Sequence, residues 1–194
     1  MLLDPLPEEV EIDGKSYFID ADYRTGILFE KLLKEKRDSE SIVSDIIDLY
    51  YPDEQPTNLN AAVQNVLDLY RCGTPAKAAK PVQKNGNVEL KQRQIYDYDV
   101  DAPYIYGAFL SEYGVDLVDV EFLHWWKFQA MFRSLGKQHK IVEIMGYRST
   151  DLSKIKNKHE RERIASLQRF YAIPDNLSFE DKVARAGAAF GGAF

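Results

Sequence analysis

The sequence predicts a mainly α-helical fold: a short β-hairpin at the amino terminus followed by helices, then a flexible linker and an all-helical carboxy-terminal bundle. Three observations support this prediction. Apolar residues recur at helical spacing over most of the chain, an Asp-Gly pair separates two short alternating segments near the start, and residues 74–94 lack both aromatic residues and apolar periodicity. A chain of 194 residues is long enough for one domain or for two small lobes.

Composition limits the function classes. The net charge of −6 disfavours general binding to nucleic-acid phosphates. The single cysteine, Cys72, cannot form an internal disulfide, which fits a reducing compartment. No apolar run approaches the roughly 20 residues that span a bilayer, and the first residues carry acids and prolines where a signal peptide has basic residues. We therefore expect a soluble cytosolic protein.

The first predicted lobe covers residues 1–73. Val10 and Ile12 alternate with acidic residues, and Asp13-Gly14 is a type I′ turn signal, so the chain begins with a hairpin. A first helix follows in the segment DADYRTGILFEKLLKEK. Two more helices have apolar stripes and start and stop signals. Their expected caps are Ser39 or Ser41 for the second helix, Asn58 or Asn60 for the third, and Gly73 at the end of the third.

Residues 74–94 form the predicted mobile basic linker. They contain two prolines, an Asn-Gly pair, and five basic residues against one acidic residue. The first lobe, by contrast, has 16 acidic and seven basic residues. The linker therefore separates a strongly acidic lobe from a nearly neutral one.

The second predicted lobe, residues 95–174, reads as helical throughout. Asp101 caps a helix over residues 104–113, and Gly114 ends it. Asp116 or Asp119 opens the next helix, which runs to about Leu135. The apolar residues of that helix cover most of its circumference, as in the centre of a bundle. A short helix follows through Ile141, Ile144 and Met145. A charged helix comes next, capped by Asp151 or Ser153 and ending near Tyr171. Residues 175–194 form a tail.

Aromatic residues are concentrated between residues 96 and 148, which hold 12 of the 24 in the chain and both tryptophans. Two interpretations follow, a packed core and a surface for a partner helix or another subunit. The residues assigned to the core are Phe122, Leu123, Trp126, Phe128 and Phe132. Those assigned to partner binding are Tyr104, Tyr106, Phe109, Tyr113 and Trp125. The first lobe is the other place where the partner surface is expected.

The sequence contains no recognised catalytic, cofactor or metal motif. Asp97, Asp99 and Asp101 resemble the start of a calcium loop, but alanine stands where that loop needs glycine and glutamate. The histidines, His124, His139 and His159, have no second ligand at metal-binding spacing. We expect no catalytic residue, cofactor or metal, although a carboxylate pair assembled by folding stays open. The basic run over residues 154–169 is interleaved with glutamates, which favours a solvated helix face over a nucleic-acid site.

An ordered set of strings resembles a family of tailed-bacteriophage proteins named after a phage "gene product fifteen". In the second half these are Tyr96-Asp97, Asp101, Tyr104-Ile105-Tyr106, Ala108-Phe109, Tyr113-Gly114-Val115-Asp116-Leu117, Leu123-His124-Trp125-Trp126-Lys127-Phe128 and Met145-Gly146-Tyr147-Arg148. In the first half the strings DADYRTGILFE and LDLYRCG are similar to the family. Val115 stands where isoleucine is commoner, and the linker and tail match nothing specific.

The resemblance implies a non-enzymatic factor of phage tail morphogenesis. Such proteins are usually encoded near the tape-measure protein of long-tailed phages of Gram-positive bacteria, in the place of a tail assembly chaperone. The implied partners are the tape-measure protein and tail-tube subunits, in the host cytoplasm during assembly, with a homo-oligomer as a further option. The alternatives are a structural minor tail or connector component of the virion, and a small enzyme with a site of dispersed carboxylates.

Overall fold

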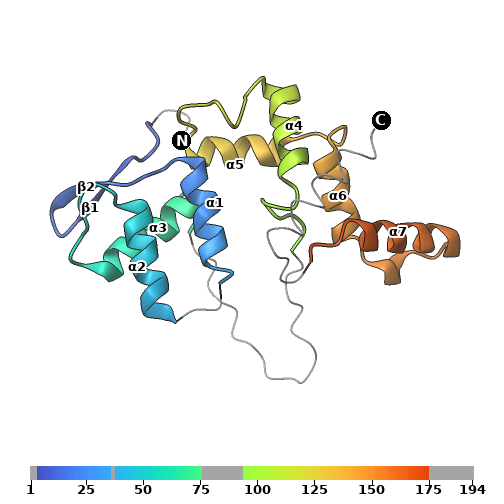
Figure 1. Ribbon diagram of the computed structural model, residues 1–194, viewed down its shortest axis with the longest axis horizontal. Coiled ribbons are helices and arrows are strands. Elements are labelled where there is room, and N and C mark those ends of the chain that lie inside the picture. The colour runs from blue at the N-terminus through green and yellow to red at the C-terminus, as the bar shows by residue number, and fades with distance from the viewer. Residues whose placement is uncertain (1–3, 36–37, 76–93, 175–194) are drawn as a thin grey trace. The chain divides into compact units, whose positions relative to one another are not determined.

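The computed structural model describes residues 4–35, 38–75 and 94–174 (Figure 1). Within these ranges two strands are followed by seven α-helices and one short 3-10 helix. This confirms the prediction of a mainly helical fold with an amino-terminal hairpin. None of the helices in the described ranges combines the length and the apolar composition that a membrane crossing requires.

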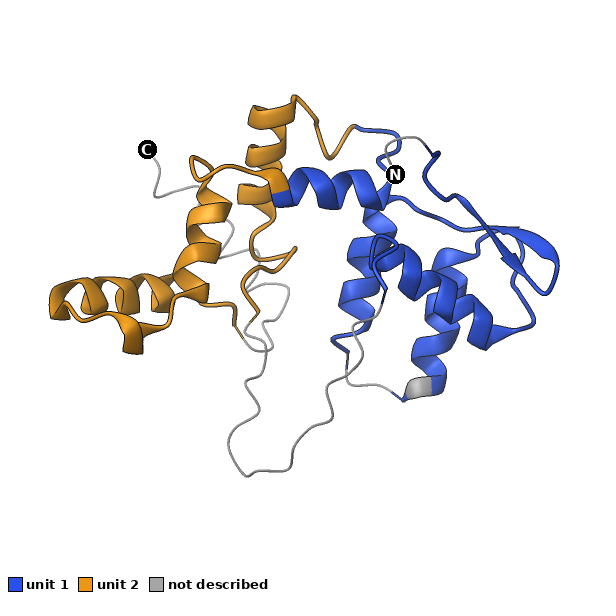
Figure 2. Cartoon of the chain, turned by 180° about the vertical axis from the view of Figure 1, so that it is seen from behind, with its two compact units in different colours: residues 1–83, 120–133 blue, residues 84–119, 134–194 orange. Residues whose placement is uncertain are grey.

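The chain divides into two compact units (Figure 2). The first comprises Met1–Gln83 and Val120–Arg133, and the second comprises Lys84–Asp119 and Ser134–Phe194. This corrects the predicted division into lobes of residues 1–73 and 95–174, because residues 120–133 belong to the first unit. Most of the predicted linker 74–94, and all of the predicted tail 175–194, lie outside the described residues.

The amino-terminal hairpin pairs β1 (Glu9–Ile12) with β2 (Lys15–Phe18) in antiparallel register, with Ile12 opposite Lys15. Asp13 and Gly14 form the two-residue turn, and their φ angles are 52° and 78°. A type I′ turn needs positive φ at both central positions, and glycine and aspartate accept this conformation more readily than most residues. The Asp-Gly signal thus predicted this turn correctly.

Three helices complete the amino-terminal part of the first unit: α1 (Tyr23–Leu32), α2 (Ser39–Tyr50) and α3 (Leu59–Tyr70). Asn58 caps α3 as expected, since its Oδ1 accepts from the Ala61 amide. The expected cap of α2 at Ser39 or Ser41 is wrong. Asp38 is the cap, and its Oδ1 accepts from the Ser41 amide at 2.8 Å.

The core of the first unit lies between the hairpin and these three helices. Phe29 of α1 is fully buried, and its ring meets the rings of Tyr50 and Tyr70 edge-on, with centroids 5.6 and 4.9 Å away. Such edge-to-face pairs add about 0.5–1.5 kcal/mol to the burial of apolar area. The other buried members of this cluster are Ile12, Ile19, Ala21, Ile46, Ile47, Tyr50, Tyr51, Ala62, Val66 and Leu69.

Helix α5 (Trp125–Ser134) begins later than predicted. Asp116 does not start it, because the Asp116 carboxylate accepts from the amides of Val118 and Asp119 in a local turn. Residues 122–124 instead lie beside the start of α1. The Leu123 carbonyl accepts from the Tyr23 amide, and the Trp125 amide donates to the Ala21 carbonyl. These backbone bonds fix the start of α5 in the first unit.

The second unit is built from α4 (Ala102–Tyr113), α6 (Lys140–Ser149) and α7 (Lys158–Phe170), with a 3-10 helix at Leu152–Lys154. Gly114 ends α4 at a φ of 64°, as expected of a glycine after a helix. The expected cap of α7 at Asp151 or Ser153 is wrong. Asp151 caps the 3-10 helix, and Asn157 caps α7 by accepting from the Glu160 amide.

A buried ion pair joins α4 to α6 in the second unit. The Arg148 guanidinium donates to both carboxylate oxygens of Asp101, and both residues are almost fully buried. Arg148 also donates to the carbonyls of Ile95 and Tyr171, so that one side chain ties together three segments of the chain. The Asp101 carboxylate accepts in addition from the Asp97 amide. Asp101 therefore acts as an ion-pair partner rather than as a side-chain helix cap.

Gly26→Ala should destabilise the first unit by about 1–3 kcal/mol, because a methyl group at this position would overlap the six-membered ring of the Trp125 indole. The control is Gly107→Ala in α4, where nothing lies within 4 Å of an added methyl group. That variant should be neutral or more stable by up to about 1 kcal/mol. Urea unfolding followed by circular dichroism measures both, and equal effects would contradict the expectation.

Arg148→Met should destabilise the second unit by about 3–5 kcal/mol, because it leaves the Asp101 carboxylate buried without its cation. Adding Asp101→Asn removes that charge while keeping an acceptor for the Asp97 amide. The double variant should therefore be more stable than the sum of the two single effects implies. Hydrogen exchange of amides in α4 and α6 measures the coupling, and strict additivity would show that the pair is not coupled.

Candidate interaction surfaces

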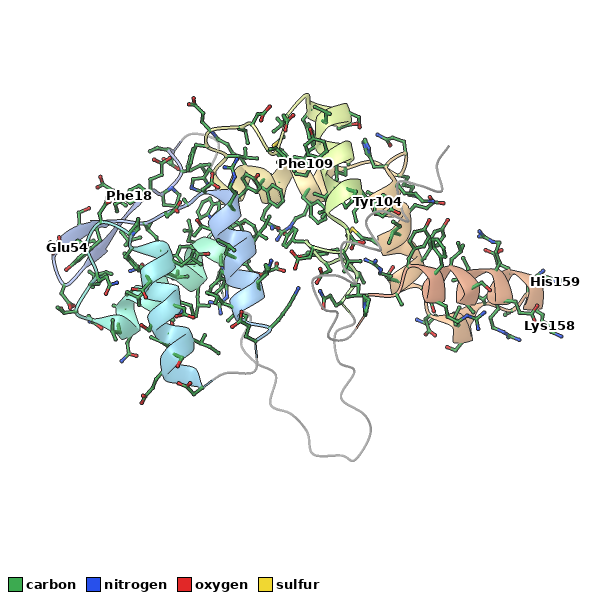
Figure 3. The ribbon with its side chains drawn as sticks, viewed as in Figure 1. Phe18, Glu54, Tyr104, Phe109, Lys158 and His159 are labelled. Atoms are coloured by element: carbon green, nitrogen blue, oxygen red, sulfur yellow. The ribbon has the colours of Figure 1, made fainter. Side chains whose placement is uncertain are left out.

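The residues assigned to partner binding lie in different settings. Figure 3 shows Tyr104 and Phe109 on α4. Phe109 is fully buried beside the ring of Tyr113, so its expected place on a surface is wrong. Tyr104, Tyr106 and Tyr113 are half-buried. The Tyr106 hydroxyl donates to Asp116 Oδ2 at 2.9 Å. The three tyrosines of α4 thus remain partly accessible to solvent, whereas Phe109 packs in the interior of the second unit.

Trp125 is the second correction, since it is only 2% exposed. Its indole stacks between the rings of Tyr70 and Phe128, with centroids 5.5 and 5.7 Å away, and its Nε1 donates to the Tyr70 carbonyl at 2.9 Å. A side chain that stacks on two rings and is bonded at its one polar atom is a packing residue. It is therefore not available to bind a partner.

The residues assigned to the core divide differently. Leu123, Phe128 and Phe132 are buried, and Trp126 is half-buried against the core of the first unit, where its Nε1 donates to the Leu69 carbonyl. Phe122 is 46% exposed, which corrects its assignment to the core. The reason is that α5 starts only at Trp125. Phe122 lies before the helix, so the argument from an apolar circumference does not apply to it.

The strings that carry the resemblance to the phage family meet inside the units. In the first unit DADYRTG lies against LHWWKF. The Asp22 carboxylate accepts from the Arg24 and Leu123 amides, Tyr23 stacks on Phe128 at 5.0 Å, and Gly26 leaves room for the Trp125 ring. In the second unit Asp101, the last aspartate of YDYDVD, meets the arginine of MGYR through the pair described above. These contacts of the strings therefore specify packing, although Leu28, Tyr104 and Tyr147 of the same strings lie on the two surfaces described below.

The histidines and the aspartate triplet do not assemble into a metal site. Within the described parts of the chain no group of three or more His, Cys, Asp or Glu side chains is placed to hold a metal ion. His139 bonds to Glu112 in the second unit at 2.9 Å. His159 is exposed at the amino-terminal end of α7, beside Lys158 (Figure 3). The Asp97 carboxylate accepts from the amides of Asp99 and Val100, which is a local turn.

The second unit carries an aromatic patch where α4, α6 and the end of α7 meet. We define the Tyr171 patch as Tyr104, Tyr147, Phe170, Tyr171 and Lys140. The Tyr171 ring contacts the other three rings, and the Lys140 ammonium lies 5.4 Å from its centroid. Phe170 is 73% exposed. A large exposed aromatic residue beside half-buried ones is typical of an interface anchor. Sequence analysis identified only Tyr104 of this set.

The first unit carries an apolar groove of about 430 Å³ between α1 and α2. We define the α1–α2 groove by its lining residues, Leu28, Lys31, Leu32, Glu35, Asp45, Asp48 and Leu49. Leu28 is 46% exposed, and Leu32 and Leu49 are half-buried. The sequence places Leu28 and Leu32 in the segment predicted as the first helix. The groove could not be predicted, because a helical pattern alone does not show which apolar positions the core leaves uncovered.

Comparison with known proteins supports the resemblance read from the strings. A family model described as "Bacteriophage Gp15 protein" matches residues 2–173. No curated protein and no solved structure matches the chain.

His124 predicts a pH dependence of stability. The Trp126 amide donates to His124 Nδ1 at 3.0 Å, so the ring is neutral, and Nε2 donates to the Pro7 carbonyl at 3.1 Å. Burial lowers the pKa of His124 below its ordinary value of 6.5. The unfolded chain therefore binds the proton more readily. The contribution of the neutral His124 ring to the free energy of unfolding is therefore complete above about pH 6.5. It is lost as the pH falls below that value, by at most about 1.4 kcal/mol per pH unit.

The measurement is urea unfolding at pH 5.5 and 7.5, followed by tryptophan fluorescence, which reports the first unit because both tryptophans belong to it. His124→Gln cannot titrate in this range and should show a smaller difference between the two pH values. The same difference in both proteins would assign the pH dependence to other groups.

Proposed function

We propose that this chain, which belongs to the bacteriophage Gp15 protein family, is a non-enzymatic factor of phage tail morphogenesis that binds other proteins of the tail. Its expected clients are the tape-measure protein and tail-tube subunits, in the cytoplasm of the bacterial host. The observation that carries the proposal is the family match over residues 2–173, which includes all the described parts of both units except Pro174.

The structure supports a binding role through two apolar surfaces, one on each unit. The α1–α2 groove exposes leucine side chains with an acidic rim, and the Tyr171 patch exposes a phenylalanine among tyrosines. Exposed apolar groups that cluster rather than scatter mark sites of protein association. Of the residues first assigned to partner binding, Tyr104 belongs to the Tyr171 patch, and Tyr106 and Tyr113 stay in the proposal as its neighbours on α4.

Two surfaces on one chain suit an extended client. A long helical protein offers many similar segments, and a binder with two weak sites gains avidity once the first site is occupied. A chaperone must also release its client, and weak individual sites permit this. We therefore favour a chaperone-like role over a permanent place in the virion.

Co-expression with the tape-measure protein tests the proposal. The tape-measure protein should be more soluble in the presence of this chain and should co-purify with it. Phe170→Ala should weaken co-purification, because it removes the most exposed ring of the Tyr171 patch. Phe18→Ala, at an exposed ring of β2, is the matched control and should have no effect. Unchanged solubility together with no co-purification would contradict the proposal.

Mass spectrometry of purified phage particles tests the chaperone-like role separately. An assembly factor should be absent from finished particles, or present far below the level of the tail-tube protein. A fixed number of copies in every particle would show that the chain is a structural component of the tail.

A further inference from the structure

The α1–α2 groove is formed by one face of each helix. Leu28, Lys31, Leu32 and Glu35 follow one another at helical spacing along α1 and the turn after it, and Asp45, Asp48 and Leu49 do so on α2. The opposite faces serve the core, to which α1 contributes Phe29 and α2 contributes Ile46, Ile47 and Tyr50. Leu32 and Leu49 also pack in part against that core, so Leu28 is the most exposed of the three leucines.

The rim of the groove is acidic. The described residues that line the groove include three acids, Glu35, Asp45 and Asp48, and one cation, Lys31. Asp48 Oδ1 accepts from Gln55 Nε2 at 2.6 Å, and this neutral donor leaves its charge in place. The excess of acids extends beyond the rim, since residues 1–73 hold 16 acidic and seven basic residues. A negative surface of this kind attracts cationic partners and accelerates their association.

The backbone of α1 and α2 decides the form of the occupant. The walls of the groove are helices, whose interior amides and carbonyls are already bonded within each helix, so a strand laid into the groove would find no ladder partners. A helix satisfies its own backbone and needs only side-chain contacts. Apolar side chains spaced by three or four residues on such a helix can enter between the leucines, as in other helix-in-groove complexes.

We propose that the α1–α2 groove is a docking site for a basic amphipathic helix of a client protein. Its aliphatic side chains would pack on Leu28, Leu32 and Leu49, and lysines or arginines on its flanks would face Glu35, Asp45 and Asp48. This inference rests on the proposed function for the source of the helix, a segment of a tail protein, and the chemistry of the groove defines its type.

The test uses the full-length protein and two labelled synthetic helices of about 18 residues, a length that covers both walls of the groove. Both peptides carry leucines at positions spaced by three and four. One has lysines on its flanks, and the other has glutamates. Fluorescence anisotropy should show binding of the lysine peptide, weaker at high salt, and at least about tenfold weaker binding of the glutamate peptide.

Two pairs of variants locate the site. Leu28→Ala should weaken binding of the lysine peptide by about fivefold or more, whereas Leu59→Ala, at a leucine of α3 that is 48% exposed and outside the groove, should leave it unchanged. Glu35→Lys should weaken binding, whereas Glu11→Lys, with the same change in net charge at an exposed position of β1, should do so far less. All four positions are exposed, so none of these substitutions should unfold the protein. Tryptophan fluorescence verifies that each variant is folded.

Several outcomes would overturn the inference. These are equal binding of the two peptides, or equal affinities of Leu28→Ala and Leu59→Ala. If no peptide binds and the chain self-associates in a way that Leu28→Ala abolishes, the groove belongs to a second copy of the chain. Intramolecular cross-links from the groove to lysines of residues 74–94, with no peptide binding, would assign it to the chain's own basic segment. If Leu28→Ala still co-purifies fully with the tape-measure protein and no peptide binds, the groove inference fails while the proposed function stands. If the lysine peptide binds but the tape-measure protein does not co-purify, the groove inference stands while the proposed function fails.

Discussion

The first unit depends on which groups donate hydrogen bonds to the carbonyls at the carboxy-terminal end of α3. The last carbonyls of a helix have no partners within it, and they need donors when they are buried. Here the carbonyls of Leu69 and Tyr70 accept from the indole nitrogens of Trp126 and Trp125, two consecutive residues that lie more than 50 positions away in the sequence. Tryptophan suits this place because it supplies one donor and a large apolar body together. The bonds hold the start of α5 in the first unit.

This contact determines the sequence around it. The Asp22 carboxylate must bond the Leu123 amide as well as cap α1, and Gly26 must lack a side chain because the Trp125 ring occupies that space. At the end of α3, Gly73 has a φ of 67°, and a methyl group there would lie 3.0 Å from the Trp126 ring. The residues that identify the family in DADYRTG, LDLYRCG and LHWWKF thus meet at one contact. Their role at this contact is to assemble the unit.

Local features could be predicted from the sequence, and contacts between distant segments could not. The Asp13-Gly14 turn, the Asn58 cap and the Gly114 stop each depend on a few neighbouring residues, and all were predicted correctly. The prediction of where α5 starts was wrong, because that start depends on backbone hydrogen bonds to Ala21 and Tyr23, about 100 residues away. Phe109 and Phe170 illustrate the same limit for the surfaces. Both are aromatic residues of helices, yet one is fully buried and the other is 73% exposed, and only packing decides between them.

Two weak sites on one chain can act together on one client. Two sites with dissociation constants of about 100 μM, joined at an effective concentration of about 1 mM, give an overall constant of about 10 μM. Such a gain holds a client that spans both sites and still allows rapid release. Because most of the affinity in this scheme comes from linkage, it depends on how the two units are joined as much as on the contacts that each unit makes.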